Sequence, residues 1–171
     1  MKKFLQQTAL AAGLMAVGFG VHAQTITLKV HHFLGPQTIQ HTTMLGDWCK
    51  NIARDSKDRL KCEIFPAMQL GGTPVQLYEQ ARDGVVDVAW TLQAYTAKLQ
   101  KLEVFELPFM MTNAEATSRA AWDYAQKFAA DDMKDVKMLA VHVHGPGNIY
   151  TKNKAVATMA DLKGPKVRAP T

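Results

Sequence analysis

The sequence predicts an α/β fold with a mainly parallel sheet flanked by helices. Segments typical of strands and of helices alternate in the order β-α-β-α-β, followed by β-α-β. Residues 85–92, VVDVAWTL, are almost continuously apolar, as in strands covered on both faces. Such strands belong mostly to parallel sheets, because crossover helices cover both faces of the sheet.

The first elements follow from hydrophobic periodicity. Residues 25–32 alternate apolar and polar positions and are rich in Thr and Val, which predicts a strand. Residues 38–57 carry apolar side chains at the spacing of one helical face. Residues 60–65 form the second predicted strand, which Pro66 ends because it cannot donate to a strand ladder.

A second helix is predicted from its end signals. Thr73 is a suitable N-cap, Pro74 suits the first helical position and Gln76 completes a capping box. Gly84 ends this helix, because glycine adopts the left-handed conformation without strain. The apolar strand at residues 85–92 follows directly.

The sequence signals for the remaining elements are weaker. Residues 102–109 are predicted to be extended, and Thr112 with Glu115 forms a capping box for a helix at 114–129. Thr158 and Asp161 are predicted to cap a short turn. The last expected elements are a strand at 136–144 and extended segments at 148–152 and 166–169. Gly164 ends the turn that precedes the last of these segments.

Residues 1–23 are typical of a secretory signal peptide, with Lys2 and Lys3 preceding an apolar run at 9–21. A membrane anchor is the alternative, but these 13 apolar residues fall short of the ~20 that span a bilayer. We therefore expect a periplasmic protein that begins at Gln24. Removing two of the 20 basic residues leaves 18 against 15 acidic ones, a net charge of +3. The lysines form no basic stripe, so nucleic acid is not an expected partner.

Cys49 and Cys62 both lie in the exported part. An oxidising compartment favours a disulfide between them, joining the first helix to the second strand. The alternative is two separate buried thiols. Two cysteines alone supply too few ligands for a zinc site.

Metal binding by histidines and catalysis by a nucleophile are two alternative functions for this chain. His31, His32, His142 and His144 could serve a periplasmic metal-binding protein only if three or four ligands converged. The alternative, which we favour, is that they lie at strand ends and bond backbone groups, so no metal or other cofactor is expected. No nucleophile elbow, phosphate loop or acid/base dyad is present, and no enzyme activity is expected.

A binding role is better supported. In open parallel sheets, ligands sit outside the carboxyl ends of the strands. His32, Phe33, Trp90 and Gln93 all fall near such ends. Ordinary core packing is the alternative for the aromatic residues. We predict that these four side chains contact a ligand.

Three segments together resemble one family: FPAMQLGGTPVQLYEQARDGVVDVAW, FELPFMMTNAEA and DLKGPKVRAPT. They are similar to the DctP-type solute receptors of tripartite ATP-independent periplasmic (TRAP) transporters, and the resemblance extends over the chain from Thr25. It implies a periplasmic-binding-protein-like fold of two α/β lobes, roughly twice this length. Residues 24–140 would then form the first lobe, and 141–171 the crossover and the start of a truncated second lobe.

The resemblance also implies a function and an anchor. Receptors of this type capture a small organic acid and pass it to membrane permease subunits. Arg168 occupies the position at which family members bind the substrate carboxylate through two hydrogen bonds, which suits a guanidinium. Asn148 falls where sialic-acid receptors carry a second arginine, and it brings no charge. We therefore expect a small monocarboxylate, aromatic or a 2-oxo acid.

Overall fold

The computed structural model describes residues 24–107, 109–111, 113–145, 148–152 and 155–166. The predicted signal peptide at 1–23 and Arg168 lie outside these residues, as does most of the predicted extended segment 166–169. Within the described residues, none of the helices is long and apolar enough to cross a membrane.

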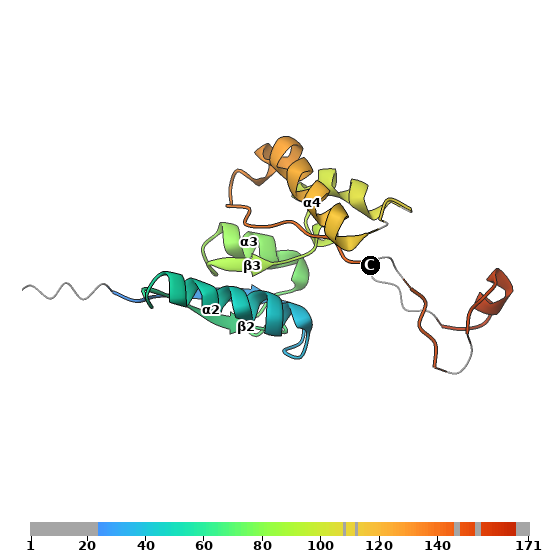
Figure 1. The fold of residues 1–171 in the computed structure, drawn as a ribbon, viewed down its shortest axis with the longest axis horizontal. Helices are drawn as coiled ribbons and strands as arrows, with labels where there is room; N and C mark the ends of the chain where they lie inside the picture. The colour runs from blue at the N-terminus through green and yellow to red at the C-terminus, as the bar shows by residue number, and fades with distance from the viewer. Residues whose placement is uncertain (1–23, 108, 112, 146–147, 153–154, 167–171) are drawn as a thin grey trace, which may run out of the picture.

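Three parallel strands form the sheet, in the order β2-β1-β3 (Figure 1). They are β1 (Ile26–His32), β2 (Leu60–Phe65) and β3 (Val88–Trp90). The register pairs His31 with Phe65 and His32 with Trp90, so all three strands end at the same edge. The predicted parallel sheet is therefore confirmed, and His32 and Trp90 lie at its carboxyl edge, with Phe33 directly after β1.

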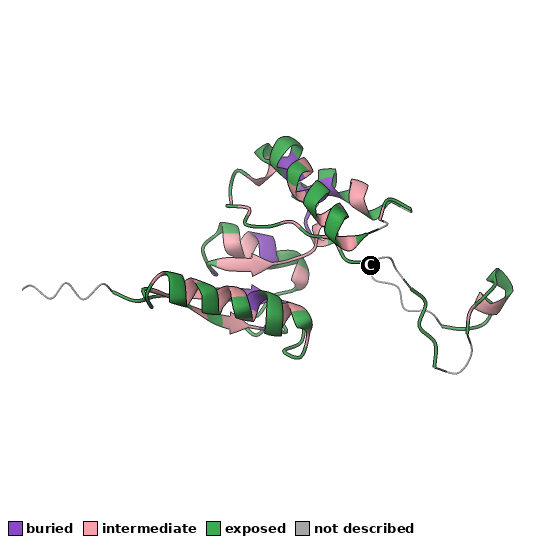
Figure 2. Cartoon of the chain, in the orientation of Figure 1, coloured by how far each residue is buried: buried purple, intermediate pink, exposed green. Residues whose placement is uncertain are grey.

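The sheet is buried toward that carboxyl edge. The first residues of β1 are exposed, whereas Val30, His31 and His32 are completely buried. Leu77 and Val86, which lie in and just after the second helical region, complete this core. Figure 2 shows buried residues in the sheet and in α3, whereas none of the residues of α2 is buried.

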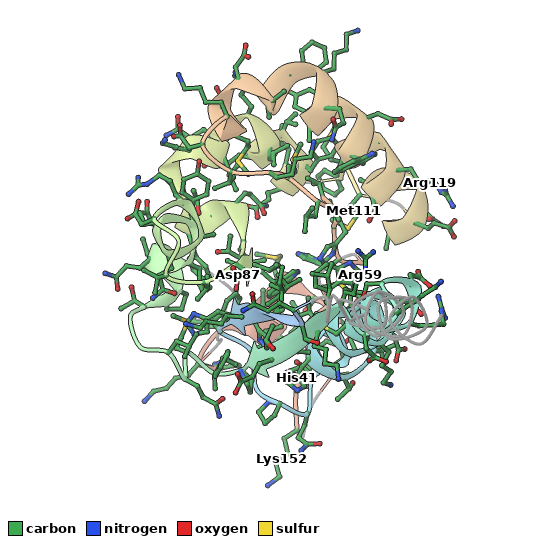
Figure 3. The ribbon with its side chains drawn as sticks, turned by 90° about the vertical axis from the view of Figure 1, so that its left-hand side faces the viewer. His41, Arg59, Asp87, Met111, Arg119 and Lys152 are labelled. Atoms are coloured by element: carbon green, nitrogen blue, oxygen red, sulfur yellow. A yellow bond between two sulfur atoms is a disulfide. The ribbon has the colours of Figure 1, made fainter. Side chains whose placement is uncertain are left out.

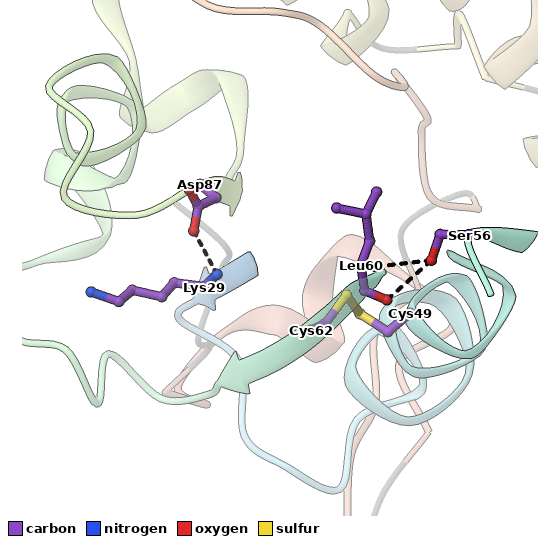
Figure 4. Close-up of a disulfide and its surroundings, with 6 residues drawn as sticks. All are labelled: Lys29, Cys49, Ser56, Leu60, Cys62 and Asp87. Carbon is purple, nitrogen blue, oxygen red and sulfur yellow. Dashed lines mark hydrogen bonds between the residues drawn. A yellow bond between two sulfur atoms is a disulfide. The ribbon is translucent and has the colours of Figure 1, made fainter. Parts of the chain in front are cut away.

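The first helical region consists of a π-helical turn, η2 (Gln40–Leu45), and α2 (Gly46–Asp55). A disulfide joins Cys49 of α2 to Cys62 of β2, with Cα atoms 5.6 Å apart (Figure 4). The Ser56 hydroxyl accepts a hydrogen bond from the Leu60 backbone N–H at 2.9 Å and so links the helix end to the strand start. The predicted helix-to-strand disulfide is confirmed.

The second helical region follows the predicted end signals. A capping box between Thr73 and Gln76 opens a 3-10 turn, η3 (Pro74–Gln76), which continues into α3 (Leu77–Arg82). Gly84 then takes a positive φ of 74°. Gly72 has a φ of 82°, and an added Cβ there would lie 2.8 Å from the Gln80 amide nitrogen.

The third strand is shorter than predicted, because β3 covers only three of residues 85–92. The backbone N–H groups of Val85 and Val86 donate to the Gln80 carbonyl at the end of α3. At the next residue, the Asp87 carboxylate accepts from the Lys29 backbone N–H at 2.7 Å (Figure 4). These bonds occupy the groups that would extend the strand pairing toward its start.

A second layer of helices lies beyond the sheet. It contains η4 (Gln93–Tyr95), η5 (Ala97–Glu106), α4 (Ala114–Tyr124), the π-helical η6 (Ala125–Ala129) and η7 (Asp131–Met133). Its core joins Leu99 and Leu102 to Ala125 and Ala129. In Figure 3, Arg119 projects outward from this layer, while Asp87 and Arg59 lie at the sheet.

The prediction of an extended segment at residues 102–109 was wrong over 102–106, which belong to the 3-10 helix η5. Side chains three residues apart share one side of a 3-10 helix. This spacing turns Leu102 and Phe105 toward the alanines of η6, and Leu99, where η5 is kinked, packs on the same core. The helix predicted at 114–129 is confirmed, but its cap is Asn113, whose side chain accepts from the Ala116 N–H at 2.9 Å. The predicted cap, Thr112, lies outside the described residues.

The strand predicted at residues 136–144 was also wrong: its described residues lie outside the sheet. Val141 packs on the core beneath α4, and the Val143 N–H donates to the Ser118 hydroxyl at 3.0 Å. Residues 148–152 form no strand either. Further on, Thr158 and Asp161 form the predicted capping box around η8 (Met159–Leu162), and Gly164 takes a φ of 99°. This turn lies away from the rest of the fold (Figure 1).

Candidate functional site

Four aromatic rings gather at the carboxyl edge of the sheet. Phe33 and Trp90 lie nearly parallel, with centroids 5.4 Å apart and an interplanar angle of 28°. Tyr95 meets Phe33 edge-on at 5.4 Å, and His142 lies nearly parallel to Trp90 at 5.9 Å. We call Phe33, Trp90, Tyr95 and His142 the ring cluster. Phe33, Trp90 and Tyr95 are half-buried and His142 is exposed, so the cluster is accessible from solvent.

The register of the sheet brings this cluster together. Because His32 pairs with Trp90, Phe33 comes directly after the end of β1 and beside the indole. Tyr95 follows Trp90 by five residues, at the end of the short helix η4 that follows β3. Parallel strands that end together place the residues after them in one neighbourhood, where ligands of open sheets sit.

The Trp90 indole N–H donates to Nε2 of His142 at 2.9 Å. An imidazole nitrogen that accepts a hydrogen bond carries no proton, so His142 is neutral here with its proton on Nδ1. Partial burial of the ring, and then the nearby His144, lower the pKa of His142 below its ordinary value. The neutral acceptor is therefore the stable form at neutral pH.

His32 lies behind the cluster, completely buried. Its Nδ1 accepts from the Leu34 backbone N–H at 3.2 Å, so its Nε2 carries the proton and donates to Nδ1 of His41 at 3.0 Å. Burial, followed by repulsion from His41 and His31, lowers the pKa of His32 to about 4. The Nδ1 atom of His32 is thus bonded to the loop that carries Phe33, and its Nε2 atom is bonded to η2.

The other predicted site residues lie as follows. Gln93, at the start of η4, donates its amide N–H to the Glu106 carboxylate. Asn148 is exposed. Arg168 lies outside the described residues, so the structure shows no position for it. Of the predicted residues that the structure describes, Phe33 and Trp90 are the two whose rings contact each other.

The histidines of the metal alternative have separate partners. His31 accepts from the Leu70 N–H and donates from Nδ1 to the Gln80 side chain at 2.8 Å, and Gln80 in turn donates to the Gly71 carbonyl. His142 bonds Trp90. Among the described residues, no three His, Cys, Asp or Glu side chains are grouped to hold a metal ion. The geometry favours the reading in which buried histidines satisfy local polar groups.

A cavity of about 410 Å³ lies elsewhere, at η5 and η7. It is lined by Lys98, Gln100, Lys101, Asp131, Asp132, Lys134 and Asp135. Lys98 pairs with Asp135, and Lys101 pairs with Asp132. Because Lys98 and Lys101 are paired with carboxylates and three aspartates line the same cavity, it favours an organic acid less than the ring cluster does.

The family model for bacterial extracellular solute-binding proteins, family 7 (DctP), matches residues 30–171. The chain belongs to this family. Family 7 comprises solute-binding proteins of transport systems and is not a family of enzymes. Its periplasmic members with known structures have the same parallel sheet flanked by helices, which confirms the predicted fold class.

Solved structures of family 7 members resemble this chain closely. A TRAP solute-binding protein from Rhodoferax ferrireducens, in complex with copurified benzoate, is 55% identical, with a TM-score of 0.79 over 86% of this chain and 46% of that one. A marine metagenome TRAP protein specific for aromatic acids, in complex with 3-hydroxybenzoate, is 46% identical, with a TM-score of 0.77 over 82% of this chain and 44% of that one.

Another relative matches almost all of this chain. The outer membrane transporter protein TsaT of Comamonas testosteroni is 30% identical over 97% of this chain and 49% of its own length. The family 7 chain described here spans about half the length of these relatives.

Sequence reasoning missed His142 and Tyr95 as members of the ring cluster. The sequence predicts His142 as a strand-end residue that bonds backbone groups or, alternatively, as a metal ligand. One signal could have found it: a half-buried Trp at a strand end needs an acceptor for its indole N–H, and histidine supplies one. Tyr95 follows β3 by only a few residues, so the rule that places ligands at strand ends also applies to it.

Proposed function

We propose that this chain provides the ring-binding part of a periplasmic TRAP receptor that captures a small aromatic monocarboxylate. The observation that carries the proposal is the ring cluster, which offers nearly parallel aromatic faces at the carboxyl edge of the sheet. Offset stacking on such faces favours a flat aromatic ligand. The relatives of known structure that bind benzoate and 3-hydroxybenzoate support this substrate class.

Arg168 is proposed as the carboxylate anchor. It lies in the segment KVR, at the position that binds carboxylate in similar receptors. A guanidinium donates two parallel hydrogen bonds to a carboxylate and stays charged when partly desolvated. Asn148 would add a donor without charge, which favours one carboxylate over two. His32, Phe33, Trp90 and Gln93 remain the predicted contacts from the sheet edge.

The cellular setting forms part of the same proposal. Residues 1–23 act as the signal peptide and direct the chain to the periplasm. Residues 24–140 form the first lobe, and residues 141–171 begin the crossover to the second. The partners are the organic acid and the membrane permease subunits of a TRAP transporter. Closure of two lobes would enclose the acid between the ring cluster and Arg168.

Titration calorimetry on the full-length gene product tests this proposal, with benzoate, 3-hydroxybenzoate and succinate as ligands. We expect the two aromatic acids to bind at micromolar or better affinity and succinate to bind at least tenfold more weakly. Arg168→Ala should abolish most of the affinity, while Arg168→Lys keeps the charge without the paired donors and should retain part of it. Equal affinity of the Arg168→Ala variant and the unaltered protein would refute the anchor.

A further inference from the structure

We propose that His142 is a positioning residue for Trp90 and thereby sets the receptor's preference for ring-bearing over aliphatic acids. The inference rests on the proposed function and extends it to a residue that no motif of the chain marks. It begins with the indole of Trp90, which has two protein rings as neighbours. Phe33 lies 28° from its plane and His142 lies 20° from it.

The hydrogen bond to His142 fixes the in-plane orientation of the Trp90 indole, which stacking alone does not fix. Ring contacts hold an indole against a neighbour but permit sliding and rotation within the plane. The bond from the indole N–H to Nε2 of His142, at 2.9 Å, removes that freedom because an N–H donor has one direction. The imidazole, nearly parallel to the indole, is then held next to it and adds a second ring to the neighbours of Trp90.

The chain around His142 is itself held firmly. Val141 packs on the core of Leu99, Leu102, Ala125 and Ala129. The backbone of Val143 donates to the Ser118 hydroxyl at 3.0 Å, and its carbonyl accepts from the same hydroxyl at 3.4 Å. Successive side chains of an extended segment point to opposite sides. His142 is therefore directed away from the core and toward Trp90, and α4 provides the fixed support.

The proposed role belongs to the acceptor nitrogen of His142 and not to its bulk. His142→Phe keeps a flat ring but removes the acceptor, whereas His142→Gln keeps an acceptor at about the position of Nε2. Ser118→Ala is the matched control, because it loosens the same segment without touching Trp90. Trp90→Phe removes the donor and keeps a ring, and it completes a double-mutant cycle with His142→Phe.

The experiment measures the affinities of benzoate and propionate for the full-length gene product and each variant by calorimetry. Both ligands carry one carboxylate, so the ratio of their affinities isolates the ring. We expect His142→Phe to lower benzoate affinity about tenfold and to leave propionate within about twofold, as for loss of one orienting hydrogen bond. His142→Gln should restore most of the ratio, and Ser118→Ala should change both affinities alike.

In the cycle, adding His142→Phe to Trp90→Phe should cause no further loss of ring preference. An unchanged benzoate-to-propionate ratio in His142→Phe would overturn this inference while leaving the proposed function intact. Additive losses in the cycle would overturn it as well. Failure of the unaltered protein to bind benzoate would instead refute the proposed function together with the preference derived from it. Thermal melting of each variant checks that the fold is retained.

Discussion

Lowering the pH from 7 to 4 should destabilise the protein through His32. The side chain is completely buried, and its pKa falls from 6.5 to about 4 in the folded state. Between these values the unfolded chain binds a proton that the folded protein does not. The contribution of neutral His32 is therefore complete above pH 6.5 and is lost as the pH falls toward 4.

The size of this effect follows from the shift. The pKa falls by about 2.5, which corresponds to roughly 3 kcal/mol of folding free energy at the acid end of the window. The structural cost is clear, because a protonated Nδ1 can no longer accept from the Leu34 N–H. The loop that carries Phe33 should then lose its attachment to the end of β1.

Urea unfolding at pH 7, 5.5 and 4 measures this loss, with His32→Asn as the control. Asparagine keeps an acceptor near the position of Nδ1 but does not titrate. We expect the variant to be less stable at pH 7 and to lose roughly 3 kcal/mol less than the unaltered protein by pH 4. Parallel losses in the two proteins would refute the reasoning, because the acid sensitivity would then come from other groups.

Two further predictions concern stability. Gly72→Ala should destabilise the fold by about 2 kcal/mol. Gly72 has a positive φ, and a Cβ there would lie 2.8 Å from the side-chain amide of Gln80, which also bonds His31. Gly71→Ala is the matched control, with the same sign of φ and no atom within 4 Å, and equal losses in thermal melting would contradict the contact. Replacing Cys49 and Cys62 together by Ser should cost about 3 kcal/mol by loop closure, and a reductant should lower the melting temperature of the unaltered protein but not of this variant.

Elements with local signals were predictable from the sequence. The strands at 26–32 and 60–65 follow from alternation, and both capping boxes, at Thr73 and at Thr158, lie where their spacing predicts. Cys49 and Cys62 could be paired because the chain reads as exported and the loop between them is short. In each case the determining contacts lie within a few residues or follow from the compartment.

The wrong predictions concern segments whose form depends on distant partners. The spacing of Leu102 and Phe105 indicates a 3-10 helix only once the alanines of η6 are known to face them. Residues 136–144 have strand composition, but Ser118 occupies the backbone groups of Val143. Composition reports the tendency of a segment to extend, whereas tertiary contacts decide what its backbone pairs with.

The candidate site was predictable in part for the same reason. Strand ends directed attention to Phe33 and Trp90, and the structure brings these rings together. His142 lies 52 residues after Trp90 in sequence, and only the path of the chain across α4 joins them. No periodicity carries that information.

The ring cluster also gives the protein a built-in optical reporter. Trp90 contacts Phe33 and His142, whereas the other two tryptophans, Trp48 and Trp122, are on α2 and α4. An aromatic acid that stacks on the cluster changes the surroundings of one indole out of three. Replacing Trp48 and Trp122 by Phe would leave a single emitter at the binding edge. Ligand capture could then be followed in real time without a label.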